Sequence, residues 1–212
     1  MNNKKIKICG VKTIATINTC IKNKVNFFGL VFFNKSPRYI SISKAKKLIE
    51  YSKNKKIKAV GVFVNLSIEK LSKIIEQTNL KYIQLHGNEN DHYMHSIKKK
   101  YNVKIIKSIG VKNKRDLEIL KKLKNADYFL FDYKPKSKEL PGGNAKKFNW
   151  KVLKDIKIGK PWFISGGINI NNVKEIGENI FPYGIDISSG VEAKLGIKSP
   201  RKINDLMKKI ND

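Results

Sequence analysis

The sequence predicts an α/β fold in which eight parallel strands alternate with helices and close into a barrel. Short apolar runs recur along the chain with helical stretches between them, which is the pattern of repeated βα units. Eight such pairs fit into 212 residues, near the lower size limit of this barrel. We therefore expect residues 1–212 to form one single-domain TIM (β/α)8 barrel, with its chemistry at the carboxyl ends of the strands.

The apolar runs define the expected strands. In chain order they are Lys5 to Cys9, Phe27 to Phe33, Ala59 to Val64, Tyr82 to Leu85, Lys104 to Ser108, Tyr128 to Asp132, Trp162 to Ser165 and Gly184 to Ile187. Helix candidates lie between them, such as Ser67 to Gln77, where Ser67 can cap the first turn. In another, Pro200 to Ile210, proline suits the first helical position.

The chain is strongly basic, with a formal net charge of +28 at pH 7. Such a charge can indicate a nucleic acid or an anionic membrane as partner. However, only three of the 45 basic residues are arginines, which make the bidentate and stacking contacts to nucleic acids, and the lysines are spread over almost every segment. We therefore expect no nucleic-acid partner and a solvated surface that still attracts anionic substrates.

The N-terminal segment has no apolar stretch long enough for a signal peptide or a membrane span. We expect a soluble, cytoplasmic protein without a membrane partner. The two cysteines, Cys9 and Cys20, lack the spacing of metal ligands, so we expect free thiols and no metal. The oligomeric state stays open between monomer and homodimer.

The first strand ends in Lys7-Ile8-Cys9-Gly10. Because side chains alternate across a strand, Lys7 and Cys9 point to one side, and Ile6 and Ile8 to the other. If the isoleucines face the helices, Lys7 and Cys9 face the barrel interior, where the ammonium is expected to lower the pKa of the thiol. Cys9 is then a candidate base or nucleophile, and a small buried apolar residue is the alternative.

Three further strand ends carry polar side chains. Arg38 follows the second strand, and its planar guanidinium suits a carboxylate, unless it is an ordinary surface residue. His86 shares a face with Gln84 after the fourth strand and can bind substrate, carry a proton or cap a loop. Asp132 ends the apolar sixth strand, where a carboxyl can be a general acid or simply open the next loop.

The loops after the last three strands are distinctive. The segment 133–149 is long for a compact domain, and such loops are often lids. The seventh and eighth strands end in Ser165-Gly166-Gly167 and Ser188-Ser189-Gly190. Small residues let backbone N–H groups approach an anion, so these loops predict a phosphate site, with plain tight turns as the alternative.

These motifs, in this order, resemble those of the phosphoribosylanthranilate isomerases of tryptophan biosynthesis over nearly the whole chain. The residues that carry the resemblance are Lys7-Ile8-Cys9-Gly10, Lys35-Ser36-Pro37-Arg38-Tyr39, Val60-Gly61-Val62-Phe63, Gln84-Leu85-His86-Gly87, Pro141-Gly142-Gly143, Ser165-Gly166-Gly167 and Asp186-Ile187-Ser188-Ser189-Gly190-Val191-Glu192. The resemblance implies a ribulose-phosphate-binding barrel that performs an Amadori rearrangement of N-(5-phosphoribosyl)anthranilate. It implies no cofactor, because the substrate's own nitrogen serves as the electron sink.

The resemblance also implies roles for individual residues. Asp132 would be the general acid that protonates the ring oxygen, and Cys9 the general base that removes the proton from the sugar C2 carbon. Arg38 would hold the anthranilate carboxylate, and Lys7, His86 and Asp186 would also contact the substrate. The phosphate would lie against Gly143, Gly166, Gly167, Ser188, Ser189 and Gly190.

The chain departs from the family pattern in the loop after the sixth strand. Asn144-Ala145 stand where the family usually has Thr-Gly, and Asn149 stands where it usually has Asp. Alanine reaches positive φ less freely than glycine, so we expect slower loop closure and slower turnover.

Other phosphate-binding barrels and an RNA-binding module are the competing interpretations. An indole-glycerol-phosphate synthase would use a Lys and Glu pair, and a ribulose-phosphate epimerase would pair Asp and His around a metal. The histidine-pathway isomerase would carry Asp at the ends of the first and fifth strands, where this chain has Cys9 and Ser108. An RNA-binding module would need clustered arginines and exposed aromatic residues, which the sequence does not indicate.

Overall fold

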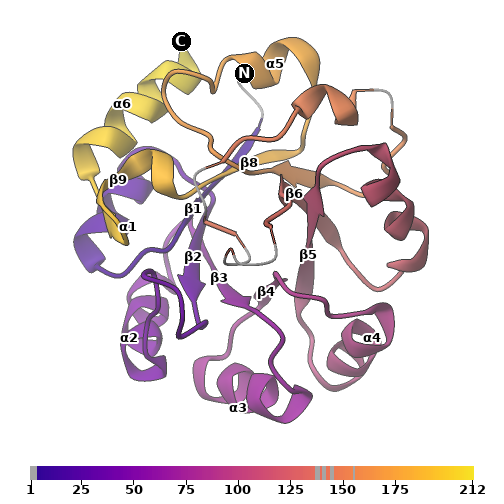
Figure 1. The fold of residues 1–212 in the computed structure, drawn as a ribbon. Helices are drawn as coiled ribbons and strands as arrows, with labels where there is room; N and C mark the ends of the chain where they lie inside the picture. The colour runs from indigo at the N-terminus through magenta and orange to yellow at the C-terminus, as the bar shows by residue number, and fades with distance from the viewer. Residues whose placement is uncertain (1–3, 137–138, 140–141, 144–145, 155) are drawn as a thin grey trace.

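The computed structural model describes residues 4–136, 139, 142–143, 146–154 and 156–212. Its eight parallel strands pair in sequence order, and β1 pairs with both β2 and β8, so the sheet closes into a barrel (Figure 1). The strands are β1 Lys5–Cys9, β2 Phe27–Val31, β3 Lys58–Phe63, β4 Tyr82–Leu85, β5 Lys104–Val111, β6 Tyr128–Tyr133, β7 Trp162–Ile164 and β8 Gly184–Ile187. The predicted (β/α)8 barrel is therefore confirmed.

Helices surround the barrel (Figure 1). They are α1 Ile14–Lys22, α2 Ile42–Ser52, α3 Ile68–Thr78, α4 Asp91–Lys100, α5 Glu175–Asn179 and α6 Pro200–Asn211, with the 3-10 helices η1 Lys114–Lys122, η2 Trp150–Leu153 and η3 Ser189–Val191. Ser67 caps α3 by accepting a hydrogen bond from the Lys70 amide, and Pro200 occupies the first turn of α6, both as predicted. A short antiparallel hairpin, β9 Glu192–Lys194 and β10 Ile197–Lys198, precedes α6.

Several element boundaries differ from the prediction. Strand β5 continues past Ser108 to Val111, because its last residues stay paired with β6, ending at the Val111 and Tyr133 pair. Strand β2 ends at Val31 rather than Phe33, and β7 ends before Ser165. The connection from β5 to β6 contains the 3-10 helix η1 instead of an α-helix.

The core has an outer layer between strands and helices and an inner layer within the barrel. Ile6 and Ile8 belong to the outer layer, as the alternation along β1 predicts. Inside the barrel, one apolar cluster consists of Phe27, Val60, Ile106, Leu130 and Phe163. A smaller one contains Cys9, Val31 and Val62, which lie at or next to the carboxyl ends of β1, β2 and β3. The inner apolar layer therefore reaches the carboxyl end of the barrel at Cys9.

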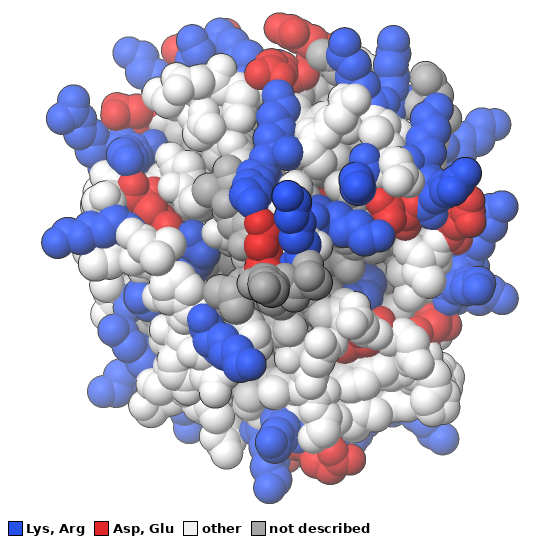
Figure 2. Space-filling model, viewed as in Figure 1, with Lys and Arg blue, Asp and Glu red and all other residues white. Residues whose placement is uncertain are grey.

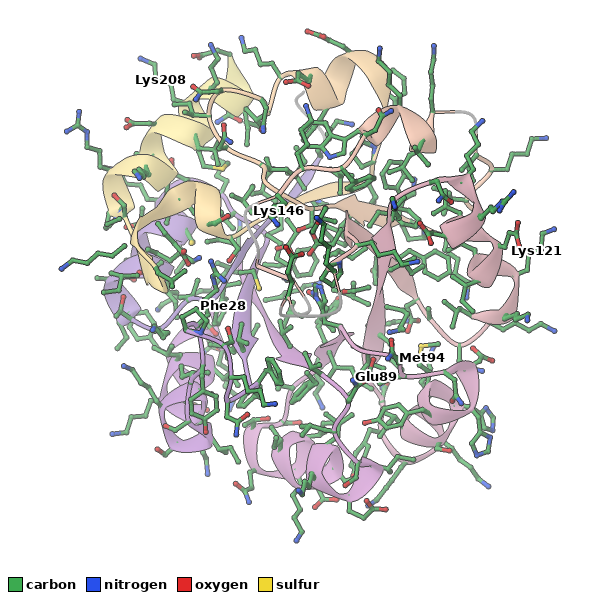
Figure 3. All side chains as sticks on the ribbon, viewed as in Figure 1. Phe28, Glu89, Met94, Lys121, Lys146 and Lys208 are labelled. Atoms are coloured by element: carbon green, nitrogen blue, oxygen red, sulfur yellow. The ribbon has the colours of Figure 1, made fainter. Side chains whose placement is uncertain are left out.

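The basic side chains are scattered rather than gathered. Figure 2 shows lysines and arginines all around the rim of the visible face and also over its centre, with acidic residues among them and broad uncharged areas between. Lys121 and Lys208 lie at the periphery, whereas Lys146 lies near the centre, over the barrel (Figure 3). Among the described residues, no helix combines the length and apolar character needed to cross a membrane.

Candidate active site

A cavity of about 290 Å³ opens among the loops that follow the strands. Seven of the predicted site residues line it, namely Cys9, Arg38, His86, Asp132, Gly143, Asp186 and Ser188, whereas Lys7 does not. A smaller pocket adjoins it through the shared Asp132 and Asp186 and is lined by the small residues of the last loops, namely Gly142, Gly143, Ser165, Gly166, Gly167, Ser188 and Ser189. The smaller pocket has a volume of only about 20 Å³, so it extends the end of the larger cavity that glycine backbone and serine side chains border.

Lys7 is fully buried in the barrel interior and forms an ion pair with Asp186. The Lys7 Nζ and Asp186 Oδ1 atoms are 2.9 Å apart, and the two residues are direct neighbours in the pairing of β1 with β8. Burial alone would lower the pKa of Lys7, but Asp186 and Cys9 outweigh burial and raise it. Lys7 is therefore a stable ammonium whose charge is balanced by a carboxylate.

The expectation of a lowered pKa for the Cys9 thiol is wrong, although Lys7 does act in the expected direction. Burial raises the pKa of the Cys9 thiol above its ordinary value, and the opposing effects of Lys7 and Lys198 are smaller. Asp186 also raises it, because its negative charge offsets that of Lys7. Gly29 on β2 leaves the space for this thiol, since a Cβ atom at Gly29 would lie 2.8 Å from the Cys9 Sγ atom.

Arg38 is buried and held by Glu192. Its Nε and Nη2 atoms donate to the two Glu192 carboxylate oxygens at 2.8 and 2.9 Å, and its Nη1 atom donates to the Gly143 carbonyl at 3.4 Å. Glu192 also accepts a hydrogen bond from Lys198 Nζ at 2.8 Å. The Nη1 and Nη2 edge of the guanidinium retains N–H donors that Glu192 does not use.

His86 connects strands β4, β5 and β6. Its Nε2 atom lies 3.4 Å from Asp132 Oδ2. Its Nδ1 atom lies 2.8 Å from Gln84 Nε2 and 3.2 Å from Ser108 Oγ. Asp132 accepts a further hydrogen bond from the Tyr133 amide through Oδ1 at 2.7 Å. The predicted shared face of Gln84 and His86 is confirmed, while the other two histidines are exposed on α4.

Of the two predicted anion loops, only the one after β7 has glycines with positive φ, at Gly166 (89°) and Gly167 (65°). Gly142 and Gly143, in the loop after β6, also have positive φ, 76° and 74°. Gly190 does not line the small pocket; it packs so closely on the Ile168 carbonyl that a Cβ atom there would clash. Asn144 and Ala145, on which the prediction of slower loop closure depends, lie outside the described residues. Asn149 caps η2 by accepting a hydrogen bond from the Lys151 amide.

Sequence reasoning assigned no role to four residues at this site. Gln84 and Ser108 orient His86, and the inward alternation of β4 and β5 would have indicated both. Glu192 and Lys198 come after the last barrel strand, and nothing in the sequence distinguishes Lys198 from the many other lysines. In the part of the chain that the structure describes, no group of three or more His, Cys, Asp and Glu residues is arranged to hold a metal.

The chain is similar to one family of enzymes along nearly its whole length. The family model described as N-(5'phosphoribosyl)anthranilate (PRA) isomerase matches residues 6–209. An N-(5'-phosphoribosyl)anthranilate isomerase of Thermoanaerobacter pseudethanolicus is 39% identical over 206 residues, covering 97% of each chain. The crystal structure of the phosphoribosyl anthranilate isomerase of Thermotoga maritima superposes with a TM-score of 0.87 at 30% identity, covering 98% of each chain. A structure of such an isomerase with reduced 1-(o-carboxyphenylamino)-1-deoxyribulose 5-phosphate has a TM-score of 0.83 at 28% identity, again covering 98% of each chain.

Proposed function

The chain belongs to the family of N-(5'-phosphoribosyl)anthranilate isomerases, and we propose that it isomerises N-(5'-phosphoribosyl)anthranilate to 1-(2-carboxyphenylamino)-1-deoxyribulose 5-phosphate in tryptophan biosynthesis. One observation supports this reaction above the others. Cys9 and Asp132, a potential base and a potential acid, line one cavity that joins a glycine-rich pocket. The cavity also contains the guanidinium of Arg38. This arrangement suits a sugar that carries a phosphate on one side and a carboxylate on the other.

Binding of the substrate would use both ends of the cavity. The phosphate would lie against Gly166, Gly167, Ser188 and Ser189, with Gly143 beside them and Gly190 supporting the loop by its close packing. The anthranilate carboxylate would accept hydrogen bonds from the free edge of Arg38. Anchoring both ends fixes the sugar between acid and base. Such positioning can lower the activation barrier by as much as about 7–11 kcal/mol.

Ring opening is assigned to Asp132. Its protonated carboxyl would give a proton to the ring oxygen, the bond from that oxygen to the anomeric carbon would break, and the nitrogen lone pair would form the iminium. His86, 3.4 Å away, is placed to contact both Asp132 and the sugar. Acid catalysis of this kind typically contributes about 10²-fold or more.

Isomerisation is assigned to Cys9. Its thiolate would take the C2 proton, and the electrons of that C–H bond would move into the iminium to give an enolamine. The enol then loses its hydroxyl proton as the C1 carbon gains one, which yields the ketose. Asp186, which lines the cavity, would contact the sugar hydroxyls, and Lys7, which is fully buried and lines neither pocket, would hold that carboxylate in place.

The proposal has a direct test. Purified protein is mixed with freshly prepared phosphoribosylanthranilate, and the fluorescence of this substrate is followed as the substrate is consumed. Rapid loss of the signal, abolished in Cys9→Ala, is the expected result. A wild-type protein that shows no consumption, although circular dichroism shows it folded, would contradict the proposal.

We also infer a cytoplasmic enzyme that works as a monomer or a homodimer, with a small phosphorylated molecule as its ligand and neither nucleic acid nor membrane as partner. The scattered rather than clustered lysines support the part of this inference that concerns nucleic acid. Light scattering on the purified protein distinguishes monomer from dimer.

A further inference from the structure

Lys198 is a buried ammonium at the edge of the candidate site that the mechanism above does not use. Its side chain is 1% exposed and lies on β10, in the hairpin whose tip residue Leu195 lines the cavity. Its Nζ atom donates to Glu192 Oε1 at 2.8 Å, to the Ser188 carbonyl at 2.9 Å and to Ser188 Oγ at 3.2 Å. These acceptors match the three donors of an ammonium and fix its position.

A hydrogen-bonded chain connects Lys198 to the backbone of Cys9. Ser188 Oγ accepts from Lys198 and donates to the Cys9 carbonyl at 3.1 Å. Ser188 is also the residue that follows β8, in one of the two predicted phosphate loops. The Ser188 side chain alone therefore separates the Lys198 ammonium from the Cys9 backbone, and Lys198 supports the Ser188 turn next to Cys9.

The charged groups near Cys9 form two clusters, of which only one is balanced. Lys7 on β1 is balanced by Asp186 on β8 at 2.9 Å. Glu192 is a single carboxylate shared by two cations, Arg38 and Lys198, so this cluster carries one net positive charge. His86 and Asp132, which face each other at 3.4 Å, are the other titratable groups that line the cavity beside Cys9.

We propose that Lys198 is a positioning residue for the isomerisation, which holds the Ser188 turn against Cys9 and supplies the unbalanced positive charge that favours the Cys9 thiolate. A buried cation stabilises a nearby thiolate because little solvent screens the attraction. Lys7 contributes less than its proximity suggests, since its carboxylate partner opposes it. The catalytic meaning of this inference rests on the proposed function, whereas the effect on the thiol does not.

The direction of the electrostatic effects agrees with this assignment. Burial raises the pKa of Cys9, Lys7 lowers it, Asp186 raises it in opposition to Lys7, and Lys198 lowers it. Burial lowers the pKa of Lys198 itself, and Glu192 and Cys9 act in the opposite direction.

The test measures the thiol itself. In a Cys20→Ala background, which leaves Cys9 as the single cysteine, the rate of alkylation by iodoacetamide is measured against pH for the parent, Lys198→Met and Lys198→Arg. We expect the midpoint of the rate profile to move up by about one pH unit in Lys198→Met, which is about tenfold slower alkylation below the midpoint. Lys198→Arg, which keeps the charge, should stay near the parent.

Lys202→Met is the matched control. Lys202 is exposed on α6 and donates to the Glu192 carbonyl at 2.7 Å, so it contacts the same residue from outside the cavity. Its loss should leave the midpoint unchanged. An unchanged midpoint in Lys198→Met, or an equal shift in Lys202→Met, would overturn the proposal. If Lys198→Met does not fold, Lys198→Gln, which keeps donors without charge, is measured instead and must show the same upward shift.

Alkylation does not require turnover, so this test and the test of the proposed function can fail separately. A shifted midpoint in a protein without isomerase activity would refute only the proposed function. An active isomerase in which Lys198→Met leaves the midpoint of the alkylation profile unchanged would refute only the role of Lys198. For the active enzyme, we expect Lys198→Met to lower kcat more than it raises KM at neutral pH.

Discussion

The His86 Nε2 atom lies 3.4 Å from the Asp132 Oδ2 atom, so the imidazole of the residue that follows β4 directly faces the proposed acid of β6. The opposite ring nitrogen, Nδ1, lies 2.8 Å from Gln84 Nε2. With the Gln84 amide nitrogen toward the ring, Nδ1 accepts and the ring proton of neutral His86 is on Nε2, where it faces Asp132; this orientation leaves the buried Gln84 Oε1 atom without a hydrogen-bond partner. We infer that Gln84 favours the tautomer in which His86 donates toward Asp132.

Replacing Gln84 tests this selection. In Gln84→Ala the Nδ1 atom loses its amide donor, and we expect both tautomers of His86 to be populated. The loss of one hydrogen bond, about 1 kcal/mol, should lower kcat about fivefold. Nitrogen NMR of the histidine rings reports the tautomer. The control is His95→Ala, on the exposed side of α4, which should leave the His86 tautomer unchanged. A single Nε2–H tautomer in Gln84→Ala would contradict the assignment.

Arg38→Lys tests the proposed carboxylate contact. A guanidinium can bind Glu192 along one edge and the substrate along another, whereas a lysine ammonium cannot serve both. The loss of a charged hydrogen bond, about 1.5–3 kcal/mol, should raise KM by about tenfold or more, with a smaller effect on kcat. Steady-state kinetics measure KM and kcat. The control is Arg201→Lys, which should change neither, because the Arg201 side chain is 92% exposed. An unchanged KM would exclude Arg38 as the carboxylate contact.

Glu192 makes the stability depend on acidity. Burial favours a higher pKa, but hydrogen bonds from Arg38 and Lys198 outweigh it and hold the pKa of Glu192 below its usual 4.5. A carboxyl whose pKa is lower in the folded protein stabilises the fold above its unfolded pKa, and this stabilisation is lost as the pH falls through the folded pKa. Wild-type protein should therefore lose stability below about pH 4.5.

Urea unfolding at neutral pH and at about pH 3.5 checks this assignment. Glu192→Gln should be less stable than wild type at neutral pH, because Arg38 and Lys198 then face each other without a carboxylate. It should also lose less stability on acidification than wild type does. Equal losses in the two proteins would show that another carboxyl is responsible.

Lys107 and Glu89 form a further buried ion pair, outside the barrel interior. Lys107 Nζ lies 3.0 Å from Glu89 Oε2 and donates to the Gly87 carbonyl at 2.6 Å. Glu89, which lies between α4 and the barrel in Figure 3, accepts from the backbone amides of Gly87 and Asn65. The pair thus secures the backbone next to His86.

Lys107→Met leaves the Glu89 carboxylate buried without its cation. We expect a loss of about 3–5 kcal/mol in the free energy of unfolding. Urea titration measures it, and Lys121→Met, at the exposed surface of η1, should change stability by less than about 0.5 kcal/mol. A Lys107→Met protein as stable as wild type would show that the pair does not hold this loop.

The barrel and the inward-facing site residues could be predicted because strand alternation and strand ends are local properties of the sequence. Lys7, Cys9 and Asp132 follow from that rule. The role of Lys198 could not, because its position depends on how the β9 and β10 hairpin packs on the end of β8. The direction of the Cys9 pKa was also beyond sequence reasoning, since it depends on burial and on Asp186, which is 177 residues away in the chain and 2.9 Å from Lys7.

The central claim is that Asp132 and Cys9 perform an acid and base isomerisation of phosphoribosylanthranilate. The most direct measurement is the turnover number of Asp132→Asn in the fluorescence assay, because this change keeps the shape of the side chain and removes only its ability to give a proton. The account predicts a fall of at least about 10²-fold with binding of the reduced product analogue retained. Turnover equal to that of the wild type would contradict it.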